Sequence, residues 1–148
     1  MKGENSKENE VYQRWTRTVK KLLQREFQVR TCSLDELKLP EKHIRFIQNY
    51  FKNVAKESYV DRIILFGSCA KGNANTTSDI DLFVITKTVL EDDSEEIYYL
   101  LYKSTENIPL SEYVCCDILT ATADDIQQCA TPLIRAILRE GVELHGVL

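Results

Sequence analysis

Two short segments of the chain carry residue types that suit phosphate and metal chemistry. One is the turn Gly67-Ser68, and the other is the acidic pair Asp79 and Asp81. Consecutive backbone N–H groups at a glycine turn, together with a serine hydroxyl, can surround anionic oxygens. Two carboxylates two residues apart offer the oxygen ligands that Mg²⁺ takes. Together the two segments predict an enzyme that binds a nucleoside triphosphate and moves its nucleotide onto a hydroxyl.

The elements around the glycine turn are predicted from the apolar pattern. Residues 60–66 end in an unbroken apolar run, which is typical of a strand buried on both faces. Gly67 would end this strand, because glycine lets the backbone turn sharply and approach a ligand closely. A short helix beginning near Ser68 would add the positive end of its dipole to the same anion pocket.

The acidic pair is predicted to open a second strand, residues 79–85. Because side chains alternate along a strand, Asp79 and Asp81 share one face while Ile80 enters the core. Carboxylates about 7 Å apart repel each other, and a dipositive ion removes that repulsion. Taken alone, each segment has a simpler interpretation: Gly67-Ser68 as an ordinary turn, and the acidic pair as a strand end that faces solvent. Both segments in this order favour the metal site.

Residues 65–84 resemble the signature of the nucleotidyltransferases related to DNA polymerase beta. In that superfamily a Gly-Ser pair precedes an Asp-x-Asp pair by ten or so residues, as Ser68 precedes Asp79 here. The segments Leu65–Ser68 and Ser78–Leu82 resemble the small branch known as minimal nucleotidyltransferases. The resemblance implies the α/β (α+β) fold of that superfamily, a small mixed sheet flanked by helices.

The resemblance also implies ligands and the residues that bind them. The substrate would be ATP or another nucleoside triphosphate, held with two Mg²⁺ ions. Gly67 and Ser68 would hold its phosphates, and Lys71 and Ser78 would complete the nucleotide-binding set. The family usually has an arginine at the position of Lys71. Lysine keeps the charge but loses the bidentate geometry of a guanidinium group.

The family needs a third carboxylate on a neighbouring strand, and Asp117 is the best candidate. It lies within the apolar stretch Tyr113–Leu119, and a buried strand rarely carries a lone aspartate unless something pairs with it. The alternative is an aspartate at a strand end, hydrogen-bonded to a loop. Asp124 and Asp125 are weaker candidates, because they resemble the first turn of a helix. The predicted metal ligands and catalytic residues are therefore Asp79, Asp81 and Asp117, with Asp117 orienting or deprotonating the acceptor.

The remaining elements of the domain follow from helical periodicity and capping residues. The predicted helices are Glu41–Lys56, Glu95–Thr105, a short one around Ile126, and one from Pro132 to Gly141. Thr131 would cap the last helix, and its expected apolar face consists of Leu133, Ile134, Ile137 and Leu138. A last short strand is expected at Val142–His145. Strands alternating with helices indicate an α/β or α+β domain.

Residues 1–40 lie outside the resemblance. Residues 1–10 are polar and without periodicity, and we expect them to be disordered. Residues 11–40 are predicted to form an N-terminal helical extension, with an amphipathic helix over Val11–Gln28 and a capping box at Ser33–Glu36. The nucleotidyltransferase domain itself is predicted to span residues 41–148.

Charge is unevenly distributed along the chain, whose net charge is −4. Residues 1–56 hold 13 Lys/Arg against 7 Asp/Glu, whereas residues 57–148 hold 6 against 16. The acidic half contains the predicted metal site, where carboxylates attract cations. The amphipathic helix carries a basic stripe that offers a surface for RNA, although such stripes are more often solvated helix faces. The stripe consists of Arg14, Arg17, Lys21 and Arg25.

Five cysteines without a C-x-x-C spacing, and no signal peptide or long apolar span, predict a cytoplasmic protein with reduced thiols and no membrane association. Cys69 lies inside the predicted phosphate loop, where a small tolerated side chain is favoured over a reactive thiol. His43 and His145 are isolated and are predicted to be structural.

The acceptor is harder to predict than the reaction. Few residues follow Asp117, so we expect the acceptor surface to come from the N-terminal helices, from a homo-oligomer or from another protein. Minimal nucleotidyltransferases typically act with a separately encoded helical HEPN partner, and some are antitoxins that adenylylate a tyrosine of that toxin. The resemblance thus implies protein adenylylation in a toxin–antitoxin pair. A nucleotidyltransferase acting on RNA or a small molecule is the first alternative. A non-catalytic binding module is the second, and the presence of all three aspartates disfavours it.

Overall fold

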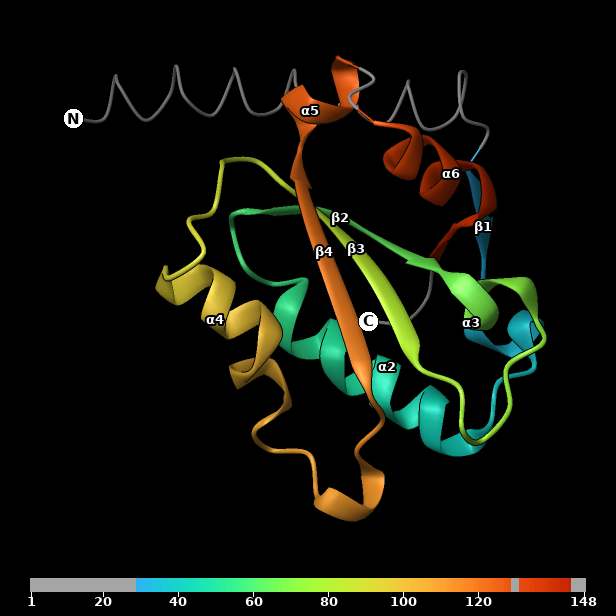
Figure 1. The fold of residues 1–148 in the computed structure, drawn as a ribbon. Helices are drawn as coiled ribbons and strands as arrows, with labels where there is room; N and C mark the ends of the chain where they lie inside the picture. Colours follow the sequence, from blue (N-terminus) through green and yellow to red (C-terminus); the bar gives the residue numbers. More distant parts are fainter. Residues whose placement is uncertain (1–28, 129–130, 145–148) are drawn as a thin grey trace.

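A mixed five-stranded sheet forms the centre of the molecule in the computed structural model, which describes residues 29–128 and 131–144 (Figure 1). The strands lie in the order β1-β5-β2-β3-β4. Their bounds are Arg30–Cys32 for β1, Val60–Phe66 for β2, Ile80–Thr86 for β3, Cys116–Thr122 for β4 and Val142–Leu144 for β5. β2 is antiparallel to β3 and β5, whereas β3 and β4 are parallel, as are β1 and β5. The predicted fold class is confirmed.

Helices and short 3-10 turns connect the strands. The helices are α2 (Glu41–Val54), α3 (Gly67–Lys71), α4 (Glu95–Leu101), α5 (Ala123–Gln127) and α6 (Pro132–Glu140). The 3-10 turns are η1 (Leu34–Leu37), η2 (Lys103–Thr105) and η3 (Leu110–Glu112). In Figure 1, α2 lies behind the sheet, while α3 directly follows β2.

The core has two parts, one on each face of the sheet. Successive residues of β3 enter different clusters, because successive side chains of a strand point to opposite faces. Leu82 packs with α2 residues such as Tyr50 in the larger cluster, and Phe83 packs with Leu138 of α6 in the smaller one. Asp81 belongs to the same face as Phe83. Leu119 of β4 lies on that face too and is 40% exposed, so α5 and α6 leave part of this face open.

Several predicted boundaries differ from the structure. α2 ends at Val54 rather than at Lys56. The helix predicted over Glu95–Thr105 is an α-helix only to Leu101, and the 3-10 turn η2 follows it. The strand that carries Asp117 begins three residues later than predicted, at Cys116, and extends to Thr122. Leu133 was expected on the buried face of α6 but is 59% exposed, because the side of the helix that faces the sheet carries Ile137 and Leu138.

Residues 29–39 do not form the helical extension that was predicted for this part of the chain. Arg30–Cys32 is the strand β1, which pairs with β5 in the register Arg30↔Val142. Ser33 makes no side-chain capping bond, so the predicted capping box is absent, and η1 is a 3-10 turn. The buried side chains of this segment are Val29, Cys32, Leu34, Leu37 and Leu39. This segment is therefore part of the folded core.

Other predictions concern residues outside the described ranges. These are the disorder of residues 1–10, the helix and basic stripe of residues 11–28, and the structural role of His145. Within the described ranges, no helix combines the length and apolar character needed to cross a membrane.

Candidate active site

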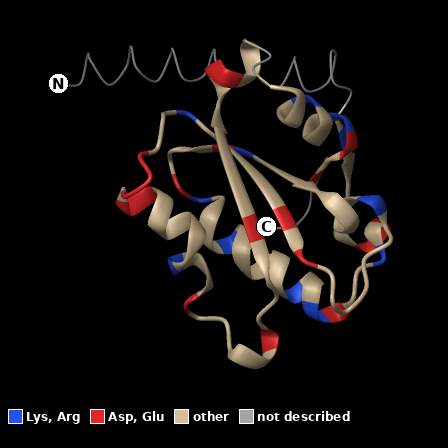
Figure 2. Cartoon of the chain, viewed as in Figure 1, with Lys and Arg blue, Asp and Glu red and all other residues tan. Residues whose placement is uncertain are grey.

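Asp81 and Asp117 lie side by side on neighbouring strands. β3 and β4 are parallel, and Asp81 is the register partner of Asp117. Adjacent strands are about 4.8 Å apart, and register partners in a parallel pair point to the same face. Each strand has a single acidic residue, which Figure 2 shows as neighbouring red bands on β3 and β4. The sheet thus brings together two predicted ligands that are far apart in sequence.

Asp79 joins this pair from the segment just before β3. Its side chain is exposed, as is that of Asp117, whereas Asp81 is partly buried between them. The pKa of Asp81 is raised above its ordinary value of 3.8, first by burial and then by the negative charges of Asp117 and Asp79. The carboxylate of Asp81 therefore experiences both neighbouring charges. Asp81, near the start of β3, is thus close enough to each of the other two predicted acids to feel its charge.

Gly67 places the turn that is predicted to bind phosphate directly against Asp81. Its φ is +73°, a left-handed conformation that favours glycine. A Cβ atom at this position would overlap Oδ2 of Asp81. The close approach has a simple origin, because Phe66, the last residue of β2, pairs with Asp81 of β3. Glycine is required here both for the backbone turn and for the space that Asp81 occupies.

The helix predicted near Ser68 is α3, which begins at Gly67. Its N-cap residue is Phe66, whose side chain has no oxygen that could accept from the first N–H groups of the helix. These N–H groups, with the Ser68 hydroxyl, can therefore serve an anionic ligand. The turn and the aspartates lie next to each other, as binding of a metal-complexed triphosphate requires.

Cys69 of α3 is an unreactive residue. Its side chain is fully buried, and its pKa is raised to about 11, mainly by burial and then by the nearby charge of Asp81. The thiol is therefore protonated near neutral pH, and its Sγ donates a hydrogen bond to the carbonyl oxygen of Asp79 at 3.4 Å. These observations agree with the small structural side chain that the sequence favoured.

Lys71 and Ser78 have other partners in the structure. Nζ of Lys71 lies 3.5 Å from Oε2 of Glu140, which links α3 to α6. Oγ of Ser78 accepts a hydrogen bond from the backbone N–H of Asn75 at 2.9 Å. The carbonyl oxygen of Ser78 accepts another from Nε2 of His43 at 2.7 Å. Their predicted roles in nucleotide binding stay predictions.

Asp124 and Asp125 belong to the start of α5, as the sequence suggested. Thr122 and Asp125 form a reciprocal capping box, in which Oγ1 of Thr122 accepts from the N–H of Asp125 at 3.1 Å. Oδ2 of Asp125 accepts from the N–H of Thr122 at 3.0 Å. Asp125 therefore has a structural role, which leaves Asp117 as the acid that β4 brings to Asp81.

Comparison with known proteins identifies the family. The sequence model of the family described as "Polymerase beta, Nucleotidyltransferase" matches residues 46–146 of the chain. This chain belongs to that family. The matched range includes the glycine-serine turn and all three predicted aspartates. A crystal structure from Sulfolobus solfataricus, provisionally named as a nucleotidyltransferase, is similar with a TM-score of 0.48 and 17% identity over 76% of this chain and 86% of that chain. No match was found among curated proteins.

The acidic side chains of this nucleotidyltransferase suit Mg²⁺ chemically. Carboxylate oxygens are the ligands this ion prefers. The pKa of Asp81 is raised first by burial and then by repulsion from Asp117 and Asp79, and a dipositive ion would relieve that repulsion. Within residues 29–128 and 131–144, however, no three His, Cys, Asp or Glu side chains are arranged closely enough to hold a metal ion together. The joint role of the three aspartates as metal ligands therefore stays a prediction.

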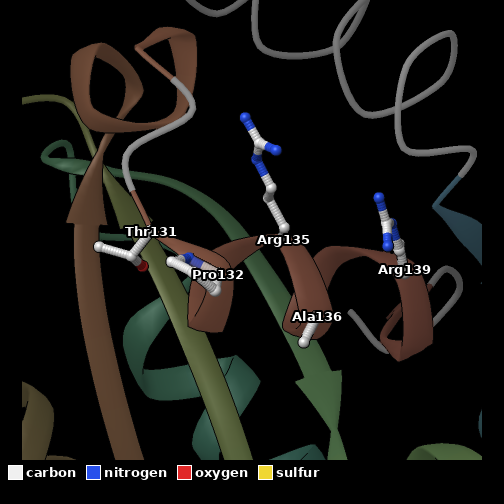
Figure 3. Close-up of a pocket in the computed structure, with 5 residues that line it drawn as sticks. All are labelled: Thr131, Pro132, Arg135, Ala136 and Arg139. Atoms are coloured by element: carbon white, nitrogen blue, oxygen red, sulfur yellow. The ribbon is translucent and has the colours of Figure 1, made fainter.

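An arginine pair on α6 lies apart from the three acids. An open pocket of about 440 Å³ is lined by Thr131, Pro132, Arg135, Ala136 and Arg139 (Figure 3). Arg135 and Arg139 are one helical turn apart and extend on the same side of α6. None of the predicted site residues of the nucleotidyltransferase lines this pocket. The sequence analysis did not single out these arginines, because two basic residues on a helix are a weak signal.

Proposed function

We propose that this nucleotidyltransferase transfers a nucleoside monophosphate from a nucleoside triphosphate to a hydroxyl in a Mg²⁺-dependent reaction. The proposed group is AMP, and its donor is ATP. The observation that supports the proposal is the pairing of Asp81 with Asp117 immediately beside the turn at Gly67. Nucleotidyl transfer depends on positioning and on neutralising charge more than on covalent catalysis. Acids on one side and an anion-binding turn on the other meet both needs.

Each residue then has a definite task. Gly67 and Ser68 bind the β- and γ-phosphates through N–H groups and the hydroxyl. Asp79, Asp81 and Asp117 hold Mg²⁺, which supplies charge neutralisation and lowers the pKa of the attacking hydroxyl when bound. Asp117, on the exposed outer strand, orients the acceptor hydroxyl and takes its proton. A bond forms between the acceptor oxygen and the α-phosphorus, the bond to the β-phosphate oxygen breaks, and pyrophosphate leaves.

The reaction type is tested with ATP radiolabelled at one position at a time. Label at the α-phosphorus should appear on the acceptor fraction of a cell lysate, whereas label at the γ-phosphorus should not. Asp117→Asn should abolish the labelling. Asp124→Asn is a matched control, because Asp124 is an exposed acid on the neighbouring helix α5, outside the site and outside the capping box. Full labelling by Asp117→Asn would refute the assignment of this residue.

We propose a protein as the acceptor, namely a separately encoded helical HEPN-type toxin for which this chain acts as antitoxin. The support is the resemblance of Leu65–Ser68 and Ser78–Leu82 to minimal nucleotidyltransferases. When this chain is co-expressed with a small helical protein encoded beside it, a tyrosine of that protein should gain one adenylyl group. The toxicity of the helical protein should also be relieved, and Asp81→Asn in this chain should prevent both effects.

An RNA acceptor is the second candidate, favoured by Arg135 and Arg139 on α6 and by the basic stripe in residues 14–25. Phosphate contacts made by arginines weaken steeply with salt, because binding releases counterions from the nucleic acid. A steep salt dependence of RNA binding that becomes shallower in a double Arg135→Ala, Arg139→Ala variant would favour this candidate over a protein acceptor.

A further inference from the structure

The short segment that carries Asp79 into β3 is held at three successive residues. The carbonyl oxygen of Ser78 accepts a hydrogen bond from Nε2 of His43 on α2, at 2.7 Å. The carbonyl oxygen of Asp79 accepts from Sγ of Cys69 on α3, at 3.4 Å. The N–H of Ile80 donates to the carbonyl oxygen of Cys115 at 2.8 Å, which begins the pairing with β4. Two of these three bonds come from side chains of different helices.

The bond from His43 is the stronger of the two side-chain contacts. His43 is only 1% exposed, and it lies 35 positions away from Ser78 in the sequence. Its Nε2 must be the donor, because a carbonyl oxygen can only accept. Nδ1 is also buried and has no hydrogen-bond partner among the described residues, so the imidazole is anchored to the loop through Nε2 alone. A thiol is a weak donor, and the Cys69 contact is longer.

Asp79 needs such an anchor because nothing in the sheet fixes it on its N-terminal side. Residues 73–79 are neither helix nor strand, and pairing of β3 starts only at Ile80. The His43 bond fixes the carbonyl of the peptide that joins Ser78 to Asp79, while the turn at Asn75 holds Ser78 and the Cys69 bond holds the carbonyl of Asp79. Asp81 and Asp117 do not depend on this bond, because the register of two paired strands holds them.

We infer that His43 is a positioning residue that fixes the backbone next to Asp79, and with it the position of the Asp79 carboxylate, through the Ser78 carbonyl. The inference rests on the proposed function, in which Asp79 is a metal ligand. The sequence analysis assigned His43 only a structural role. Partners that orient metal ligands from outside the coordination sphere typically affect metal affinity by about 10- to 100-fold when removed.

A matched control lies on the same helix. Nδ2 of Asn53 donates to the carbonyl oxygen of Ser104 at 2.7 Å, so α2 makes two side-chain bonds of equal length to distant carbonyls. The Asn53 bond fixes η2, which carries none of the three predicted ligands. Loss of either bond should lower thermal stability, but only loss of the His43 bond should affect the metal site.

The test measures Mg²⁺ binding by calorimetry in the full chain without nucleotide, together with thermal melting and hydrogen exchange of the Ile80 amide. His43→Leu should weaken Mg²⁺ binding about tenfold or more and speed exchange at Ile80. Asn53→Leu should reduce the melting temperature while leaving both readouts at the wild-type value. His43→Gln, whose amide can replace the Nε2 donor, should retain Mg²⁺ binding, and His43→Asn, which is too short to reach Ser78, should not.

The outcomes separate this inference from the proposed function. Equal Mg²⁺ binding by wild type, His43→Leu and His43→Asn would overturn the role of His43 and leave the proposed function standing. If His43→Leu does not fold, the comparison of His43→Gln with His43→Asn decides in the same way. A wild-type chain that binds no Mg²⁺ would overturn both the proposed function and the inference that rests on it.

Discussion

At the scale of single residues, the site combines groups that repel one another. Asp81 is partly buried and is also near the charges of Asp117 and Asp79, which is why its pKa is raised. A carboxyl group with a raised pKa in the folded state binds its proton more tightly there than in the unfolded chain. Stability from this group is therefore present at low pH and declines as the pH rises from the ordinary value of 3.8 through the raised value.

Asp81→Asn should therefore stabilise the metal-free protein while removing its activity. Near neutral pH and in the presence of a chelator, we expect a higher melting temperature than in wild type, because the amide is uncharged. The difference should vanish below pH 3.8, where the wild-type carboxyl is itself protonated. Added Mg²⁺ should raise the melting temperature of wild type and not of the variant. A metal-free variant that melts below wild type near neutral pH would contradict this explanation.

Gly67→Ala should impair both the fold and the site. A left-handed backbone costs about 1–2 kcal/mol for a residue with a Cβ, and this Cβ would also displace the Asp81 carboxylate. Gly72→Ala is the matched control, because Gly72 has a φ of +76° but open space around it, with the nearest atom, the carbonyl oxygen of Leu37, at 3.9 Å. Urea unfolding and nucleotidyl transfer should both be affected in Gly67→Ala, and unfolding alone in Gly72→Ala. Equal activity of the two variants would show that the close approach to Asp81 is unimportant.

At the scale of elements, the sequence was most informative where one local signal decides the structure. The glycine after an apolar run correctly predicted the end of β2 and the start of α3, and Thr131 with Pro132 correctly predicted the start of α6. The start of β4 was predicted three residues too early, because Tyr113 and Val114 are apolar whether or not they pair. Val114 is buried in the core outside the strand. Apolar pattern predicts burial better than it predicts strand pairing.

The capping box of α5 gives a test that separates structural from catalytic acids. Asp125→Ala should lower the free energy of unfolding by about 0.5–2 kcal/mol, the usual effect of losing a helix cap. Nucleotidyl transfer at a temperature where the variant is folded should be unchanged, because Asp125 bonds only to Thr122 in the box. Chemical denaturation and the α-label assay measure the two effects. Lost transfer with unchanged stability would assign Asp125 to the site instead.

At the scale of the whole molecule, long-range contacts set the limit of sequence-based prediction. β1 has three residues and acquires strand structure only by pairing with β5, which lies more than a hundred positions away. The bond from His43 to Ser78 likewise depends on how α2 packs against the loop. The placement of Asp117 beside Asp81 could be predicted because the acidic motif and the lone acid in an apolar strand are local features, whereas the role of the aspartates as metal ligands stays a prediction. The ion pair of Lys71 with Glu140 is a long-range contact, and it could not be predicted.

The contribution of residues 29–40 to the folded core can be tested by shortening the chain. A chain that starts at residue 41 would lose β1 and the buried Leu34, Leu37 and Leu39. Burial of each leucine contributes about 1.5–3 kcal/mol, so the shortened chain should be less stable by at least about 4 kcal/mol or fail to fold. A chain that starts at residue 29 should unfold cooperatively in urea, as a domain with its core intact does. Equal urea midpoints for the two chains would instead place the boundary at residue 41.

The position of β4 at the end of the strand order bears on which acceptors the site can receive. Among the described strands, β4 pairs on one side only, and the side chain of Asp117 is exposed. A bulky acceptor, even a folded macromolecule, can approach that carboxylate laterally without passing through a channel. Discrimination between acceptors must then arise from the fit of two broad surfaces rather than from the size of an enclosed hole.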